Sequence, residues 1–200
     1  MDKKFELAII IGSVRQNRFG PVVARWFLQQ VEAYGGFHAS VIDLAETPLP
    51  LVLPPEPPAM ATTDARPAEM ASVSKTLAAA DAFVIVTPEY NRSFPASLKS
   101  LIDWHYSEWR AKPIGFVSYS GGSSGGLRAV EQLRLIFAEL HAVTVRDSVS
   151  FARYWKEFDE EGRLMDPDDA KETASAMLVQ LGWWGDALRE ARTHWAYPSP

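Results

Sequence analysis

The chain has 200 residues, of which 47% are hydrophobic and 22% charged, the balance of an ordinary soluble globular protein with room for one domain. A formal net charge of −5 argues against nucleic acid or an anionic membrane as a partner. The absence of cysteine excludes disulfides, thiolate metal sites, iron–sulfur clusters and a cysteine nucleophile. The four histidines lack metal-ligand spacing, so no metal site is expected. The first apolar run is too short for a signal peptide or membrane span, which predicts a cytoplasmic protein.

Short apolar runs alternate with segments of helical periodicity over residues 1–150. Unalternating runs of β-branched residues are typical of strands that are buried on both faces of a parallel sheet. The alternation predicts an α/β, flavodoxin-like fold with a five-stranded parallel sheet and helices on both faces. In such sheets ligands bind beyond the carboxyl ends of the strands. We expect strands at 7–11, 39–44, 82–87, 114–119 and 143–149, and helices at 19–34, 67–80, 95–109 and 127–140.

Two further segments depart from this alternation. Residues 47–67 hold seven of the fourteen prolines and are predicted to form a loop that serves as a lid, an interface arm or a mobile segment. Residues 151–200 are expected to be a C-terminal extension with one helix at 168–194. Its apolar face, which includes Met177 and Leu181, is predicted to pack on the sheet of the same domain, and a dimerisation arm is the alternative.

The first of three unusual loops spans residues 12–20, between the first strand and the first helix. A helix N-terminus offers free amides and a partial positive charge, which suit a phosphate group. Ser13 and Asn17 can donate hydrogen bonds to phosphate oxygens, and Arg15 and Arg18 can neutralise their charge. Neither a Walker loop nor G-x-G-x-x-G is present, which disfavours the dinucleotide-binding fold. A polar turn with solvated arginines is the alternative.

The second loop, T-P-E-Y-N-R-S-F-P at residues 87–95, follows the third predicted strand. Proline and aromatic residues directly after a buried strand favour a rigid wall over a flexible connection. Backbone amides of such a loop can bond the polar edge of a flat heterocycle while Tyr90 packs nearby. A capped strand–helix turn with a solvated Glu89 is the alternative.

The third loop, S-Y-S-G-G-S-S-G-G at residues 118–126, carries four glycines that allow a ligand to approach the backbone closely. The stretch 121–125 also satisfies G-x-S-x-G around Ser123, in the strand–turn–helix context of a hydrolase nucleophile. A hydrolase needs a histidine on a late loop, and no histidine follows on such a loop except His194, near the tail. The other two loops would then have no role, so we disfavour this interpretation.

Taken together, the three loops resemble those of the NADPH-dependent FMN reductase family, a flavodoxin-like group with azoreductase-like, chromate-reductase-like and quinone-reductase-like members. The resemblance covers about residues 5–150, and T-P-E-Y-N is its most specific part. Its matching segments are I-G-S-V-R at 11–15, T-P-E-Y-N at 87–91 and G-G-L-R-A at 125–129.

The resemblance implies an FMN-binding domain at 1–150 and assigns thirteen residues to the cofactor. Four of them would surround the FMN phosphate, namely Ser13, Arg15, Asn17 and Arg18. Four would line the isoalloxazine ring, namely Pro88, Glu89, Tyr90 and Asn91. Five would face its other edge, namely Ser118, Tyr119, Ser120, Gly121 and Gly122. Because the flavin does the chemistry, no catalytic side chain is expected.

The implied activity is that of an FMN-containing oxidoreductase, with NADPH or NADH as co-substrate. Hydride would pass to the flavin and the electrons then to a quinone, flavin, azo compound or similar small-molecule acceptor, in a ping-pong scheme. A homodimer or homotetramer is expected. The alternatives are a flavodoxin-like electron carrier and an FMN-binding module without substrate turnover.

Overall fold

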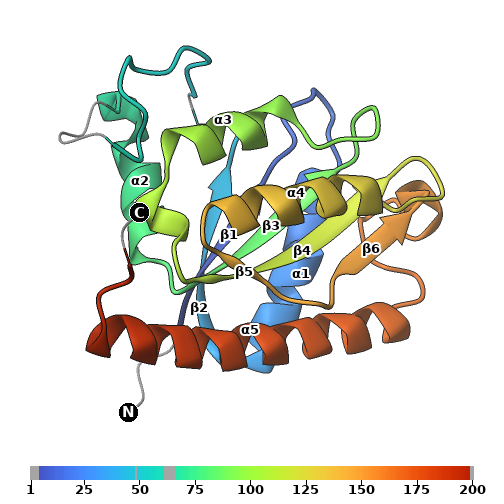
Figure 1. Ribbon diagram of the computed structural model, residues 1–200. Coiled ribbons are helices and arrows are strands. Elements are labelled where there is room, and N and C mark those ends of the chain that lie inside the picture. Colours follow the sequence, from blue (N-terminus) through green and yellow to red (C-terminus); the bar gives the residue numbers. More distant parts are fainter. Residues whose placement is uncertain (1–4, 48, 61–65, 199–200) are drawn as a thin grey trace.

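The computed structural model describes residues 5–47, 49–60 and 66–198. Within these residues all the paired strands are parallel, in the order β2-β1-β3-β4-β5, and β6 also pairs with β4 (Figure 1). This order confirms the flavodoxin-like α/β fold. The strands are β1 (Phe5–Ile11), β2 (Phe37–Asp43), β3 (Ala82–Pro88), β4 (Pro113–Ser120), β5 (Val143–Thr144) and β6 (Val149–Ala152).

Helices cover both faces of the sheet (Figure 1). On one face lie α1 (Gly20–Tyr34) and α5 (Asp168–His194), and on the other lie α2 (Ala71–Ala79), α3 (Ala96–Trp104) and α4 (Leu127–Glu139). Three short 3₁₀ helices are η1 (Ala68–Met70), η2 (Ser107–Trp109) and η3 (Tyr154–Lys156). Among the helices of the described residues, none is long and apolar enough to cross a membrane.

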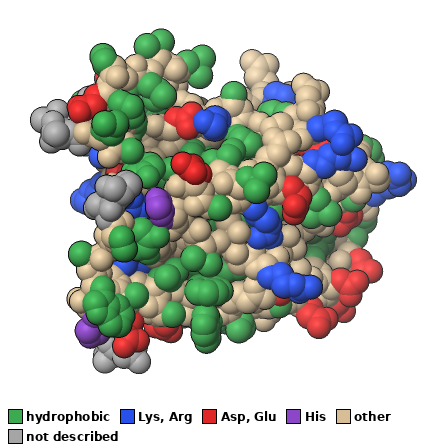
Figure 2. Space-filling model, in the orientation of Figure 1, with side chains coloured by type: hydrophobic (Ala, Val, Ile, Leu, Met, Phe, Trp, Pro, Cys, Tyr) green, Lys and Arg blue, Asp and Glu red, His purple; other side chains and the backbone are tan. Residues whose placement is uncertain are grey.

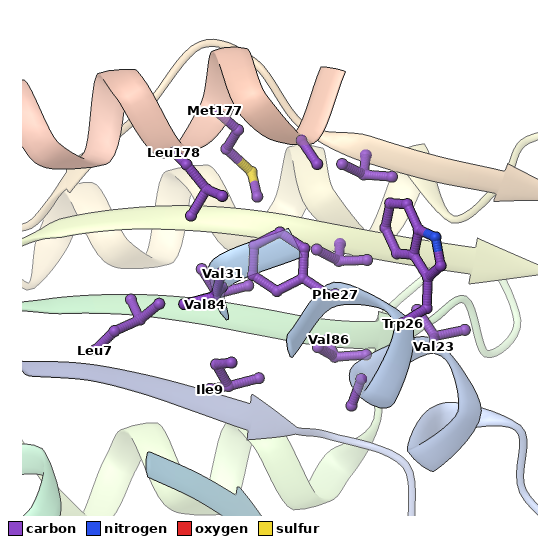
Figure 3. Packing of buried hydrophobic residues seen from close by; sticks show 14 of the residues in the cluster. Leu7, Ile9, Val23, Trp26, Phe27, Val31, Val84, Val86, Met177 and Leu178 are labelled. Carbon is purple, nitrogen blue, oxygen red and sulfur yellow. The ribbon is translucent and has the colours of Figure 1, made fainter. Parts of the chain in front are cut away.

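The strands are apolar on both sides because each side meets a helix layer. Leu7, Ile9 and Val84 face Phe27 of α1 and Met177 of α5 (Figure 3). Their neighbours in sequence, such as Ile10, belong to the cluster on the opposite face. The apolar runs therefore lack alternation, as is usual for parallel strands.

The last strand differs from the prediction, because the expected strand 143–149 is divided into β5 and β6. Arg134 donates hydrogen bonds to the carbonyl oxygens of Val145 and Arg146 (2.6 and 2.9 Å), and Gln180 Oε1 accepts one from the amide of Asp147 (3.3 Å). These side chains occupy backbone groups that a continuous strand would use in its ladder.

The C-terminal segment shares the core of the sheet. β6 pairs with β4 and runs through position 150, where the sequence suggested a boundary. Ala174, Met177, Leu178 and Leu181 of α5 are buried against α1 and the sheet (Figure 3). Residues beyond 150 are thus placed where they can reach the loops at the carboxyl edge.

The helix predicted at 95–109 is also shorter than expected, since α3 ends at Trp104. His105 takes an extended conformation, with φ −130° and ψ 136°. Its carbonyl oxygen accepts a hydrogen bond from Trp109 Nε1 (3.0 Å), and the amide of Tyr106 donates to Glu108 Oε2 (3.1 Å). Side chains thus satisfy the backbone groups that a longer helix would have paired.

The strand order brings the three unusual loops together. The chain passes from β1 to β2 on one side and then crosses to β3 on the other. Both β2 and β3 pair with β1 in parallel, and β4 follows β3. The loops after β1, β3 and β4 therefore emerge side by side at one edge, the place where doubly wound sheets bind ligands.

Candidate functional site

A pocket of about 280 Å³ lies where the three loops meet. It brings together most of the residues that the sequence nominated. Its lining is Arg15, Asn17, Arg18 and Phe19 from the first loop, Pro88, Glu89 and Tyr90 from the second, Tyr119, Ser120 and Gly121 from the third, and Tyr154 and Trp155 from the C-terminal segment.

Four nominated residues lie outside this lining. Ser13 is buried beneath the first loop, and Asn91 is exposed at the tip of the second. The Ser118 hydroxyl donates to the carbonyl oxygen of Gly125 (2.8 Å), so it supports the third loop from below. Gly122 contributes its carbonyl oxygen, which accepts a hydrogen bond from Ser120 Oγ (3.1 Å).

The two arginines of the first loop have different surroundings. Arg18 Nη2 pairs with Asp43 Oδ2 at 2.6 Å, and its Nη1 donates to the carbonyl oxygen of Ser13 (3.1 Å). Arg15 is exposed, has no ion-pair partner among the described residues, and has its guanidinium carbon 5.8 Å from the centre of the Tyr90 ring. Arg18 therefore braces the loop, while Arg15 is available to an anion.

Two buried hydroxyl groups near the start of α1 have no partner among the described residues except each other. Ser13 Oγ and Tyr119 Oη are inaccessible to solvent, and the only side-chain group that either of them meets is the other hydroxyl. A Cβ atom on Gly20 would lie 2.3 Å from Ser13 Oγ and 3.0 Å from Tyr119 Oη, so only glycine leaves room there. Burial raises the pKa of Tyr119 above its ordinary range, which keeps the phenol protonated and able to donate.

This donor set fits the phosphate of FMN. An unpartnered buried hydroxyl costs about 1–3 kcal/mol, so such groups mark a place for a polar ligand. Here two buried hydroxyls, the N-terminus of α1 with the amide of Gly20, and the exposed Arg15 lie at one end of the pocket. Hydroxyl donors, helix amides and a planar cation are the groups that bind phosphate.

The second loop is held in a tight turn. The amide of Tyr90 donates to the carbonyl oxygen of Ser93 (2.8 Å), and the reverse bond measures 2.9 Å. Asn91 and Arg92 both have left-handed backbone conformations, with φ of 50° and 68°. Gln132 of α4 clamps the turn, because its Nε2 donates to the Arg92 carbonyl oxygen (2.7 Å) and its Oε1 accepts from Ser93 Oγ (2.6 Å).

Glu89 connects the second loop to the third. Its carboxylate accepts hydrogen bonds from Arg128 Nη1 (2.8 Å) and Ser124 Oγ (2.9 Å), and its side chain is 8% exposed. Burial alone raises the pKa of Glu89, but the bonds from Arg128 and Ser124 lower it below its usual value. The solvated Glu89 considered from sequence is therefore wrong, and the carboxylate is ionised at neutral pH.

Sequence reasoning missed three aromatic residues of the pocket. Phe19 was placed where the first loop meets the first helix but was given no role at the site, whereas Tyr154 and Trp155 lie beyond the part of the chain that carried the resemblance. The density of aromatic residues in F-A-R-Y-W-K-E-F at 151–158 was the available signal.

The G-x-S-x-G pattern has no catalytic surroundings. Ser123 is exposed, and no histidine is present among the described residues that line the pocket. The catalytic arrangement of a hydrolase, with a histidine beside the nucleophile, is thus missing from this pocket.

The fold and the site define a class of protein. A parallel sheet with the order 2-1-3-4-5, whose pocket lies at the carboxyl ends of β1, β3 and β4, belongs to the flavodoxin-like mononucleotide-binding proteins. Residues 5–156 match the family model described as NADPH-dependent FMN reductase. The chain belongs to this family, which confirms the resemblance and the expectation of a flavin-dependent, NAD(P)H-linked oxidoreductase.

Individual relatives agree with this assignment. The NAD(P)H-dependent FMN reductase of Schizosaccharomyces pombe is 36% identical over 121 residues, which are 60% of this chain and 60% of the relative. The probable NADPH:quinone oxidoreductase 2 of Oryza sativa subsp. japonica is 31% identical over 186 residues, which cover 90% of this chain and 88% of the relative. The flavoenzyme FerB of Paracoccus denitrificans, an NAD(P)H:(acceptor) oxidoreductase, has a similar fold, with a TM-score of 0.68 and 19% sequence identity. The match covers 93% of this chain and 98% of FerB.

Proposed function

We propose that this protein binds FMN in the pocket between the three loops and uses NAD(P)H to reduce a small acceptor such as a quinone, a flavin or an azo compound. The observation that carries the proposal is the pair of buried hydroxyls, Ser13 Oγ and Tyr119 Oη, whose only partner among the described residues is each other, beside the exposed Arg15. Membership of the FMN reductase family supports the cofactor and the nicotinamide.

Each loop has a distinct part in this proposal. Ser13, Arg15 and Asn17 hold the phosphate, and the Tyr119 hydroxyl adds a donor that the sequence had assigned to the ring. Arg18 acts on the phosphate through the loop that it braces against Asp43. The ring lies against Pro88 to Asn91 of the clamped turn and Ser118 to Gly122 of the glycine loop. The amides of Glu89 and Tyr90 already donate to the carbonyl oxygens of Tyr119 and Ser93 (3.2 and 2.8 Å), so the amides that bond the ring come from Gly121 and Gly122.

Chemistry and binding are divided between cofactor and protein. When bound, FMN takes a hydride from NAD(P)H and gives two electrons to a second substrate. The nicotinamide and the acceptor occupy the same open side of the pocket in turn, which gives ping-pong kinetics. The clamp from Gln132 and the link from Glu89 keep the walls of the pocket fixed during both half-reactions.

The phosphate assignment predicts the effect of Arg15→Ala. Loss of one charge-assisted hydrogen bond is expected to weaken FMN binding by about 2 kcal/mol, or about 30-fold in Kd. Because Arg15 is exposed, unfolding by urea stays unchanged. Fluorescence titration of the apoprotein with FMN measures the effect, and Arg25→Ala, at an exposed position of α1, is the control. Equal FMN affinity in both variants contradicts the assignment.

Anaerobic mixing of the FMN-loaded protein with NADPH or NADH tests the reductase function. An enzyme bleaches the flavin absorbance rapidly and regains it on addition of a quinone. An electron carrier, or an FMN-binding module without substrate turnover, shows no bleaching with either nicotinamide. A module that has lost the flavin keeps no yellow colour once added FMN is removed by gel filtration. Either of these two results overturns the proposed function.

We further propose a cytoplasmic homodimer or homotetramer. Leu51 and Val52 in the described part of the proline-rich loop are each 83% exposed, and Trp183 of α5 is 64% exposed. Hydrophobic side chains gather over α5 along the lower edge of the molecule (Figure 2). Exposed apolar side chains that gather on one element, as they do on α5, are typical of interfaces. Sedimentation equilibrium is expected to give a mass two or four times that of the chain, and a monomer at micromolar concentration contradicts this.

A further inference from the structure

The C-terminal segment places a tryptophan at the rim of the pocket. After β6 the chain reverses at Arg153, which has a left-handed φ of 49°, and enters η3. The amide of Arg153 donates to the carbonyl oxygen of Gly122 (3.1 Å), which attaches the start of η3 to the glycine loop. Tyr154 and Trp155 follow directly and both line the pocket.

Tyr154 is fixed by aromatic neighbours. Its ring stacks on Phe19 with centroids 4.4 Å apart and an interplanar angle of 25°, and it meets Tyr119 edge to face at 5.6 Å. Phe158 lies edge to face with Phe19 at 5.2 Å. Several such contacts hold one side chain in one orientation, so Tyr154 is a rigid support for its neighbour.

Trp155 rests on this support and remains open to solvent. Its ring meets Tyr154 edge to face at 5.4 Å, and a Cβ on Gly121 would lie 3.1 Å from its Cζ3. The indole therefore stands against the glycine loop at the mouth of the pocket. It is nevertheless 54% exposed. A large aromatic ring that is held in place yet left uncovered beside a pocket is typical of a binding surface.

We propose that Trp155 forms one wall of the acceptor site and selects planar aromatic acceptors of the quinone type by stacking. This inference rests on the proposed function and adds its specificity-determining residue. A flat quinone ring has no charge for Arg15 to bind, so ring contacts supply its affinity. An indole provides such a surface, and its loss removes stacking while the phosphate site, formed by other residues, stays intact.

The test uses the FMN-loaded protein and menadione, a planar naphthoquinone. Without a nicotinamide no reaction takes place, so a saturable change in the absorbance of the bound flavin reports the menadione Kd in the wild type and in every variant, whichever tryptophans they hold. Trp155→Ala is expected to raise this Kd about tenfold, and the KM for menadione with it, which is the effect of about 1.4 kcal/mol of stacking. Trp155→Phe keeps a ring and is expected to stay within about threefold of the wild type.

Two controls separate this role from others. Ferricyanide accepts electrons without a flat ring, so its KM is expected to be equal in the wild type and in Trp155→Ala. Trp183→Ala removes an exposed tryptophan of α5 and is expected to leave the menadione Kd unchanged. An unchanged menadione Kd in Trp155→Ala overturns the inference. A tenfold rise in its FMN Kd also overturns it, because Trp155 then belongs to the flavin's own site.

The outcomes also distinguish this inference from the proposed function. If menadione binds in a Trp155-dependent way but NAD(P)H is not oxidised, the proposed function fails and the binding site stands. If NAD(P)H is oxidised with ferricyanide and Trp155→Ala binds menadione like the wild type, the function stands and the inference fails.

Discussion

Gly126→Ala is expected to destabilise the protein by about 3 kcal/mol and to weaken FMN binding. Gly126 is the N-cap of α4 and has φ 91°, a conformation that side-chain-bearing residues rarely adopt. A Cβ there would lie 2.7 Å from Ser118 Cβ and 2.9 Å from the amide nitrogen of Tyr119. The backbone strain and the overlap each cost about 1–3 kcal/mol. Relief of the overlap displaces the glycine loop from β4.

Gly122→Ala is the matched control in the same loop. A Cβ at Gly122 would meet no atom closer than Ser120 Oγ at 3.9 Å, and its φ is not positive. The free energy of unfolding of Gly122→Ala is therefore expected to lie within about 0.5 kcal/mol of that of the wild type. Urea unfolding of the apoprotein measures both variants, and FMN titration measures the weakened binding of Gly126→Ala against the wild type. Equal unfolding midpoints for the two variants contradict the role given to Gly126.

Lys112 is expected to make stability depend on pH in the alkaline range. Lys112 is 7% exposed, and its Nζ donates to the carbonyl oxygens of Leu77 and Ala78, both at 3.1 Å, near the end of α2. Burial, helped by the charge of Arg192, lowers the pKa of Lys112 to about 8, although Asp81 acts in the opposite direction.

The sign follows from proton binding. Between pH 8 and 10.5 the unfolded chain still holds the lysine proton that the folded chain has lost, so stability rises with pH in this window. Below pH 8 both states are protonated and the penalty of burying the charge is constant. The difference between the two pKa values corresponds to about 3 kcal/mol.

Lys112→Met removes this titration. The free energy of unfolding of the wild type, relative to that of the variant, is therefore expected to increase by about 3 kcal/mol between pH 7.5 and 10.5. Urea unfolding across this range measures the difference, in which the titration of other groups cancels. Lys75→Met, at an exposed position of α2, is the control for loss of a lysine charge. A difference that stays constant with pH contradicts the prediction.

Much of the fold was predictable because its determinants are local. The apolar runs at 82–87 and 114–119 become β3 and β4, and the helix predicted at 168–194 has the bounds of α5. The break between β5 and β6 was not predictable, since it depends on Arg134 and Gln180, which reach the backbone from other elements. The early end of α3 similarly depends on Glu108 and Trp109 beyond it.

The site was predictable at the level of loops and less so at the level of side chains. The sequence predicts the same phosphate-binding role for Arg15 and Arg18. Only the folded chain shows that Arg18 forms an ion pair with Asp43. Glu89 looked solvated because its partners, Arg128 and Ser124, lie in another loop and helix. Trp155 reaches the pocket through the left-handed turn at Arg153. This conformation is uncommon for arginine, so the sequence does not predict it.

The division of the last strand gives the chain a place where its length can change without a change of strand register. β5 is anchored opposite Pro113 and Ile114, and β6 opposite the end of β4, so each keeps its own register. Residues 145–148 between them lie outside both strands. Because β6 keeps its register on β4, an insertion or deletion there is taken up by the connecting segment and leaves η3 in place at the mouth of the pocket. The chain can therefore change in length at this point while the groups at the pocket remain constant.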